Sequence, residues 1–343
     1  MDIALLIIVA VGFYVTLLLT PPIVKFCHNH RILDYPGGRK IHQAPVPRIG
    51  GVAMFTAFLV AAIIGLLIYS GVYYQFRTEI FGILLGMIII FAGGLIDDIY
   101  DLKPLYKFLF QSAAAIVTIS FGYQVTLLTI PFKGTVSLGV WGAPVTFIWI
   151  VGLINAINFL DGMDGLAAGV GLIISATFLI SGIILETFLP VIFAAALLGV
   201  TAGFLRHNYP PASIFMGDSG AMMIGYLFAV ISVIWPKSLA TITMIVPFMA
   251  LGVPLAESAI TISRRLLTGK SIYIADTRHI HHLLKSAGLS DKAILWIFYL
   301  ASMLFSFMVI AILSPNRGLA TGLMAIFVLI VFILLLKSAR KLF

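Results

Sequence analysis

Two adjacent acids stand at the polar end of a strongly apolar segment, in the stretch GGLIDDIYDLKPLYK. Asp97 and Asp98 are expensive to place beside hydrocarbon unless they face protein, water or a cation. Paired carboxylates suit a divalent metal, or a pair in which one acid acts as a base because its neighbour raises its pKa. An ordinary helix end at the water boundary is the alternative. Gly93-Gly94 favours a close helix contact here, which that alternative does not require.

A second group of oxygen-bearing residues follows in NAINFLDGMDG, where Asn158, Asp161 and Asp164 are three residues apart. That spacing could place all three on one face of a helical turn. Carboxylate and amide oxygens together suit a hard cation or a ribose. The segment contains no Lys or Arg, so its acids do not offset a basic surface. The ligand spacing of a calcium loop is absent as well.

A third group lies in RHNYPPASIFMGDSG, where Pro210-Pro211 is expected to end a helix. Asp218 could be a metal ligand presented from a rigid turn, or a simple N-terminal cap of the next helix. Phe215 offers a flat apolar surface beside it on which a nucleobase could pack.

The longest polar connection carries three histidines in four residues, in the run HIHH. His279, His281 and His282 lack the i, i+4 spacing of a zinc pair. Cys27 is the single cysteine of the chain, so no cysteine motif for zinc is present. With Arg278 beside them, the histidines suit a polyanionic ligand such as a diphosphate. Positive charge that follows from membrane insertion would explain the arginine but not the histidines.

The first polar connection contains PGGRKIHQAPVPRIGG, a stiff segment rich in glycine, proline and cations such as Lys40. Attraction to anionic lipid explains these cations as well as specific capture of a lipid phosphate does. The residues alone leave both interpretations open.

The elements that must position these groups are membrane helices. Hydrophobic residues make up 61% of the 343 residues and charged residues only 10%, against about 25% in soluble proteins. This composition excludes a water-soluble globule, a disordered chain and a secreted domain. The first apolar run starts without a basic region and has no small-residue cleavage signal, so it is expected to be a retained span.

Hydropathy predicts an all-α polytopic membrane protein with about eleven transmembrane helices. The predicted spans are 3–26, 50–70, 79–96, 104–122, 143–159, 165–184, 187–205, 219–235, 239–263, 292–313 and 317–336. One side of this topology receives 17 of the 21 Lys and Arg residues, which the positive-inside rule assigns to the cytoplasm. The N-terminus is then outside and the C-terminus is cytoplasmic.

The chain is therefore predicted to form a single integral membrane domain over 1–343, with its chemistry on the cytoplasmic face. All histidines and ten of the thirteen acids fall there. The loops expected to build the site are about 27–49, 97–107, 158–165, 206–220 and 264–292. On the outer side, residues 123–142 alternate around Lys133-Gly134 and predict a small β-hairpin without a function.

Two other classes of membrane protein fit the sequence less well. The CDP-alcohol phosphotransferases need an Arg after DxxDGxxA, and this chain has Gly169 there, with no acids in the apolar run beyond. Transporters place ionisable groups near the midplane of their helices. Glu257 is the deepest candidate here, and the other helix centres are almost free of charge.

Taken in order, the motifs resemble the polyprenyl-phosphate N-acetylhexosamine-1-phosphate transferases, in the WecA/TagO-like branch of the MraY-related glycosyltransferase 4 family. The resemblance runs from PGGRKIHQAPVPRIGG through GLIDDIYDLKPLYK, NAINFLDGMDGLAAG and NYPPASIFMGDSG to DTRHIHHLL. It covers nearly the whole membrane region. The form HIHH is more similar to this branch than to the HHH run of the MraY branch, which favours UDP-GlcNAc over UDP-MurNAc-pentapeptide as donor.

The resemblance implies a bacterial cytoplasmic-membrane transferase with Mg²⁺, or Mn²⁺, as cofactor. It would move a sugar-1-phosphate from a UDP-sugar to undecaprenyl phosphate and release UMP; an MraY-type transferase is the nearer alternative and an anionic-substrate transporter the more distant one. Membrane lipids and a possible homodimer are the other implied partners, and no nucleic acid is expected. The implied roles are catalysis for Asp97 and Asp98, metal binding for Asp218 and Asn158, nucleotide-sugar binding for Asp161, Asp164, Phe215, Arg278, His279, His281 and His282, and phosphate binding for Lys40 and Lys107.

Two positions depart from the family pattern. Glu257, in PLAES, stands where relatives usually carry Asp, which leaves its role in doubt. Ala221 follows GDSG where Ser is common, which affects only the start of a helix.

Overall fold

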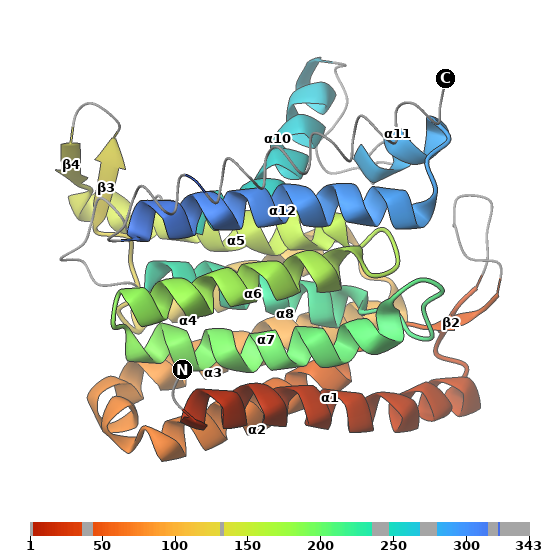
Figure 1. Ribbon diagram of the computed structural model, residues 1–343, viewed down its shortest axis with the longest axis horizontal. Coiled ribbons are helices and arrows are strands. Elements are labelled where there is room, and N and C mark those ends of the chain that lie inside the picture. Colours follow the sequence, from red (N-terminus) through yellow and green to blue (C-terminus); the bar gives the residue numbers. More distant parts are fainter. Residues whose placement is uncertain are drawn as a thin grey trace.

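The computed structural model describes residues 3–35, 44–130, 134–234, 247–267, 280–314 and 322. Most of its helices run roughly alongside one another in one bundle (Figure 1). The elements are α1 (Ile3–His30), β1 (Leu33–Asp34), β2 (Val46–Pro47), α2 (Gly51–Ile68), α3 (Ser70–Tyr100), α4 (Pro104–Ser120), β3 (Leu127–Ile130), β4 (Gly134–Ser137), a 3-10 turn (Gly139–Trp141), α5 (Gly142–Leu160), α6 (Leu166–Ile184), α7 (Phe188–Asn208), α8 (Gly217–Val233), α10 (Gly252–Leu267), α11 (Ile280–Ser286) and α12 (Asp291–Leu313).

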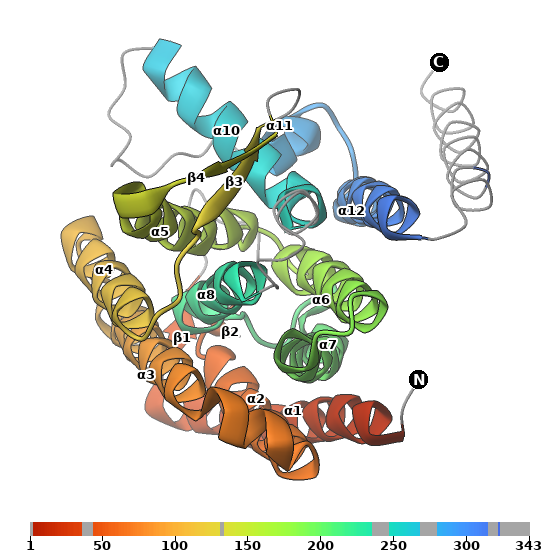
Figure 2. The same ribbon diagram turned by 90° about the vertical axis from the view of Figure 1, so that its left-hand side faces the viewer.

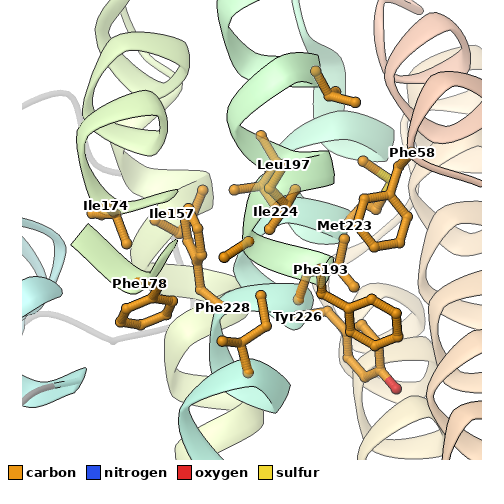
Figure 3. Packing of buried hydrophobic residues seen from close by; sticks show 14 of the residues in the cluster. Phe58, Ile157, Ile174, Phe178, Phe193, Leu197, Met223, Ile224, Tyr226 and Phe228 are labelled. Carbon is orange, nitrogen blue, oxygen red and sulfur yellow. The ribbon is translucent and has the colours of Figure 1, made fainter. Parts of the chain in front are cut away.

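Helix α8 forms the centre of the bundle, with α2, α3, α5 and α7 packed around it (Figure 2). Every residue of α8 from Ser219 to Ser232 is buried. Figure 3 shows Phe228 of α8 close to Phe178 of α6, and the two rings meet edge to face with centroids 5.8 Å apart. A helix enclosed on all sides can be apolar all round, which is the pattern that α8 has.

The chain is a multi-pass membrane protein. Seven of the described helices are long and apolar enough to cross a membrane: α1, α2, α3, α5, α6, α7 and α12. Helix α8 is apolar but has only 17 residues. The predicted count of eleven spans stays a prediction, and the eleventh, 317–336, lies outside the described residues apart from residue 322.

The ninth predicted span, 239–263, is described only in its second half. Residues 235–246 lie outside the described part, residues 247–250 are helical, and α10 runs from Gly252 to Leu267. Helix α10 is inclined to the other helices in both views (Figures 1 and 2). It therefore extends past the predicted end of the span at residue 263.

The predicted polar loops are shorter than expected because the helices run past their apolar segments. Helix α3 continues through Asp97 and Asp98 to Tyr100, α1 continues to His30, and α7 to Asn208. Hydropathy detects the part of a helix in hydrocarbon, whereas backbone hydrogen bonds extend the helix as far as protein contacts satisfy its polar residues. Asp97 and Asp98, which were assigned to a loop, thus lie on the end of a helix.

The predicted hairpin within 123–142 is confirmed. Strands β3 and β4 pair antiparallel, with Leu127 opposite Ser137 and Ile130 opposite Gly134. The hairpin precedes the first residue of α5, whereas the motif that contains Asp161 follows its last residue. The hairpin and the predicted chemistry therefore lie at opposite ends of the bundle (Figure 1).

Candidate functional site

An acidic cluster lies where the last turn of α3 meets the first turns of α4 and α8. One carboxylate oxygen from each of Asp97, Asp98 and Asp218 lies within 4.8 Å of the others. The Lys107 Nζ atom lies 2.7 Å from Asp97 Oδ2 and 2.6 Å from Asp218 Oδ2. Three acids and one lysine leave two negative charges uncompensated, which equals the charge of a divalent cation.

The chain turns sharply between α3 and α4 to bring Lys107 back to Asp97. Asp101 ends α3 in the left-handed region, with φ of 48°, and its N–H donates to the Asp97 carbonyl. Pro104 then occupies the first turn of α4, where its fixed φ suits a helix start and its missing N–H costs nothing. Lys107 follows three residues later, directly above the acids that it contacts.

The two adjacent acids face different partners. Asp98 is buried, and its carboxylate accepts hydrogen bonds from the backbone N–H groups of Asp218 (2.7 Å) and Ser219 (3.1 Å) and from the Ser219 hydroxyl. It therefore satisfies the free N–H groups at the start of α8. Asp97 instead pairs with Lys107 and accepts from the Leu102 N–H. Asp98 thus fixes the start of α8, the helix that carries Asp218, whereas Asp97 lies beside the ammonium group of Lys107.

Glycines let α3 and α8 come this close. A Cβ atom on Gly94 would lie 2.5 Å from the Cα atom of Ser219, which is too close for two non-bonded carbon atoms. Gly217 begins α8 with φ of +71°, and a Cβ atom there would lie 2.6 Å from the Asp98 carboxylate. The predicted close helix contact at Gly93-Gly94 is thus confirmed at Gly94, and Gly93 faces the Phe110 ring.

Helix α5 approaches the cluster through Asn158, whose side-chain amide donates to Asp218 Oδ1 at 3.1 Å. One turn deeper, Gln111 of α4 and Asn155 of α5 exchange two amide hydrogen bonds, at 2.9 and 3.3 Å. This pair fixes the spacing of the two helices from which Lys107 and Asn158 both reach Asp218. In this arrangement Asn158 orients Asp218, and its assignment as a metal ligand stays a prediction.

The loop after α5 is joined to the loop after α7. Asn208, at the end of α7, accepts from the Gly165 N–H and donates to the Ile214 carbonyl, both at 2.9 Å. Asp164 accepts from the Ala212 N–H at 3.0 Å. Asp164 therefore braces the wall of the site, a role that its spacing alone did not predict.

Asp161 is the loop acid that is most strongly affected by the cluster. Burial, followed by the nearby negative charges of Asp218 and Asp98, raises the pKa of Asp161 well above its ordinary value. Negative charge thus accumulates beyond what Lys107 offsets. A bound cation would relieve it.

A cavity of about 920 Å³ opens beside this cluster. Its lining includes Asp98, Asp218, Asp161, Asp164 and Phe215, and also His282. Asp97 and Lys107 do not line it and are joined to it through Asp218. The cavity is large enough for a ligand the size of a nucleotide, and the three acidic motifs and the histidine run meet at its wall.

Phe215 is held by a backbone ladder between the first and third polar connections. Its N–H donates to the Pro47 carbonyl at 2.8 Å, and its carbonyl accepts from the Gly50 N–H at 3.0 Å. Met216 accepts in turn from Gly51. The ladder sets both Phe215 at the cavity and the start of α8.

The histidine run forms part of a short helix rather than a loop. His281 is buried, and its ring approaches Gly162 so closely that a Cβ atom there would lie 2.6 Å from Nε2. The rings of His281 and His282 have centroids 4.4 Å apart, and His282 reaches the cavity. Arg278, His279 and Lys40 lie outside the described residues, so their assignments stay predictions.

Several lining residues were not selected from the sequence. Asp34, Asn208 and Lys292 belong to this group, and so does Arg48. Arg48 donates to Asp101 at 2.8 Å and to the Asp97 carbonyl at 3.3 Å, which ties the first connection to the end of α3. Its place in VPRIGG, just before the glycines of the backbone ladder, was the available signal.

The acidic cluster suits a divalent cation by its chemistry. Its donors are carboxylate oxygens, which hard cations such as Mg²⁺ prefer. With all three acids ionised, the cluster carries two negative charges beyond the one that Lys107 offsets, which a divalent cation would balance. Asp218 is the acid that both faces the cavity and contacts Lys107, so it is the ligand that these residues best support.

Comparison with known proteins finds relatives over most of the chain. Residues 80–236 match the family described as "Glycosyl transferase family 4". A Bacillus subtilis protein named "Probable undecaprenyl-phosphate N-acetylglucosaminyl 1-phosphate transferase" is 34% identical, over 97% of this chain and 92% of its own. A Mycobacterium tuberculosis "Decaprenyl-phosphate N-acetylglucosaminephosphotransferase" is 32% identical over 83% of this chain and 77% of its own. A Thermoanaerobacter "Phospho-N-acetylmuramoyl-pentapeptide-transferase" is 30% identical over 85% of this chain and 92% of its own. The chain belongs to glycosyl transferase family 4.

Proposed function

We propose that this protein transfers N-acetylglucosamine 1-phosphate from UDP-GlcNAc to a polyprenyl phosphate, with release of UMP. The observation that carries the proposal is Asp218, which lines the nucleotide-sized cavity on one side and contacts Lys107 on the other. A reaction that joins two phosphate groups needs a residue that can act on both of them. The names of the Bacillus and Mycobacterium relatives support the choice of sugar and acceptor.

The cavity is the proposed donor site. The diphosphate would lie near Asp218 and His282, and Phe215 offers the apolar surface for the base. A divalent cation, Mg²⁺ in the simplest case, would be held by Asp218 with its neighbours Asp97 and Asp98. When bound, it offsets charge on the diphosphate and makes the sugar-linked phosphorus easier to attack.

The other side of Asp218 is the proposed acceptor site. The Lys107 side chain is 30% exposed, so its ammonium can bind the phosphate of the lipid while it stays paired to the acids. Asp97, 2.7 Å from that ammonium, is placed to take a proton from the acceptor phosphate. An oxygen of the acceptor then forms a bond to the sugar-linked phosphorus, the diphosphate bridge breaks, and UMP leaves.

We further infer that this end of the bundle is cytoplasmic. The positive-inside assignment of 17 of the 21 basic residues supports that orientation, with the N-terminus outside. The eleven-span topology belongs to the same proposal. Accessibility labelling of single cysteines, introduced at the β3–β4 hairpin and near Pro211 in a C27S background, tests it.

The function is tested with purified protein, undecaprenyl phosphate and Mg²⁺, in a panel of UDP-sugars read out as UMP. UDP-GlcNAc should release UMP and form the lipid-linked sugar. UDP-MurNAc-pentapeptide as the preferred donor would support the function named for the Thermoanaerobacter relative instead. No UMP from any donor would contradict the transferase assignment and favour a carrier.

A further inference from the structure

Glu257 of α10 is a buried carboxylate that the reaction above does not use. Its side chain has no solvent exposure, and its Oε1 atom accepts a hydrogen bond from the Ile280 N–H at 2.9 Å. It is not among the residues that line the cavity. We propose that Glu257 is a positioning residue that fixes α11, and through it His282, at the donor site; this rests on the proposed function.

The contact acts on the residue directly before His281 and His282. Ile280 is the first residue of α11 that the structure describes, and its N–H donates to the Glu257 carboxylate. A buried carboxylate that accepts this hydrogen bond fixes the backbone at that point. His281 and His282 are the next two residues, and so a displacement of Ile280 would move both imidazoles.

Helix α11, which Glu257 fixes, has little room to move. The His281 ring packs directly on Gly162, in the loop that also carries Asp161 and Asp164. The adjacent ring of His282 reaches the cavity. A small rotation of α11 would therefore either press His281 into Gly162 or turn His282 away from the donor diphosphate.

A second attachment of α11 is weaker by its surroundings. Lys285 pairs with Asp291 at 2.8 Å, but their side chains are 37% and 38% exposed. Exposed pairs of this kind contribute little because water and salt screen them. A hydrogen bond to a fully buried carboxylate is not screened, and its loss leaves a buried polar group unsatisfied. Glu257 is thus the stronger of the two attachments.

Hydrogen exchange tests the contact without relying on turnover. In E257A, a peptide covering 280–286 should exchange faster than in the wild type. E257Q should restore protection because the amide oxygen can still accept from Ile280. E186A, at an exposed glutamate in the connection between α6 and α7, is the control and should leave this peptide unchanged.

Kinetics tests the link to His282. E257A should raise the KM for UDP-GlcNAc about tenfold, with the KM for undecaprenyl phosphate unchanged and near wild-type values in E257Q. H282A should act on the same constant. The double variant E257A/H282A should be no worse than the worse single variant, because both changes remove the same imidazole from the donor.

Unchanged exchange of 280–286 in E257A would overturn the proposal, and so would E257Q behaving like E257A. Multiplying effects in the double variant would show that Glu257 does not act through His282. If the wild type releases no UMP from UDP-GlcNAc, the proposed function fails, whereas the exchange data still decide whether Glu257 holds α11. Should E257A fail to fold, E257Q and H282A still give the comparison: a tenfold KM effect in E257Q would overturn the assignment.

Discussion

The two sides of the cavity are built in different ways. On the acidic side, Asp98 binds the start of α8 with both carboxylate oxygens, and Gly94 lets α3 touch the α8 backbone. On the histidine side, the short α11 is attached by the contact of His281 with Gly162, by the hydrogen bond to Glu257 and by the Lys285–Asp291 pair, and its apolar residues Ile280 and Leu284 pack against the core. Long helices hold the first side, and a short helix with a few side-chain contacts forms the second.

This difference suits two different tasks. Transfer between two phosphates requires charged groups that keep their positions during the reaction. Helix ends whose backbones are in direct contact can hold charged groups in this way. Recognition of a donor requires groups that can adapt as the ligand enters, and a short helix on few attachments is better suited to that. Substitutions on the acidic side should therefore reduce turnover, whereas those on the histidine side should weaken donor binding.

The largest effect is expected for D218A. Asp218 lines the proposed donor cavity, contacts Lys107 and accepts from Asn158, so D218A removes the proposed metal ligand between the two substrates. UMP release should fall by about a thousandfold or more, since metal stabilisation is worth several kcal/mol. The measurement is kcat with saturating substrates and Mg²⁺. Near-normal turnover would refute the metal assignment.

Mg²⁺ binding provides the control for that variant. In the wild type, Mg²⁺ should raise the thermal unfolding midpoint, because a ligand that binds only the folded state stabilises it. In D218A the shift should disappear while the protein still inserts and purifies. A shift of the same size in both proteins would separate the ion from Asp218 and contradict the site.

The next effect distinguishes the adjacent acids. D97N and D98N should both lose most turnover, by about a hundredfold or more for D97N if it acts as the base. D98N should also lower Tm by a few degrees, because an amide cannot accept from both Asp218 and Ser219 and leaves a buried donor unsatisfied, at about 1–3 kcal/mol. D97N should lower Tm less than D98N, since Asp97 accepts one backbone N–H rather than two and the lost pair with Lys107 is partly exposed on the lysine.

Kinetics and thermal unfolding of the two variants, measured side by side, check this division. Equal losses of Tm would mean that both acids hold the fold. A D98N protein with full stability and no activity would move the chemistry from Asp97 to Asp98.

A smaller effect is expected for G94A. The added methyl group would lie 2.5 Å from the Ser219 Cα atom, so α3 and α8 must separate. Overpacking of this kind costs about 1–3 kcal/mol, and turnover should fall because Asp98 moves with α3. G152A is the matched control: a Cβ atom on Gly152 of α5 meets nothing within 4 Å, so stability and turnover should be kept or slightly improved. Equal behaviour of the two variants would show that close packing does not hold the acidic side.

The sequence predicted the acidic side better than the histidine side, and the reason is physical. Acids beside a membrane helix are costly, so Asp97 and Asp98 stand out in an apolar chain, and the adjacent glycine Gly94 indicates a close helix contact. Asp161 and Asp218 stood out in the same way, and the structure brings them to one cavity. The hairpin was also predictable because it has its own period of two.

What the sequence could not predict depends on contacts between distant segments. The binding of α8 by Asp98 and the brace from Asp164 to Ala212 join residues that are far apart in the chain. The predicted end of α3 lay too early in the chain. Its polar last turn contacts Arg48 and α8 instead of lipid, and hydropathy cannot detect such a turn. The hydrogen bond from the Ile280 N–H to Glu257 could not be predicted either, because a hydropathy profile contains no information on such contacts.

The smallest effect is expected for K285M, on the histidine side. The pair of Lys285 with Asp291 is more than one-third exposed on both side chains, so its loss should cost less than about 1 kcal/mol. The KM for UDP-GlcNAc should change less than about twofold, and exchange of residues 280–286 should stay near the wild-type rate. A tenfold rise in K285M would mean that a surface pair positions the histidines, and the contrast between buried and exposed attachments of α11 would be wrong.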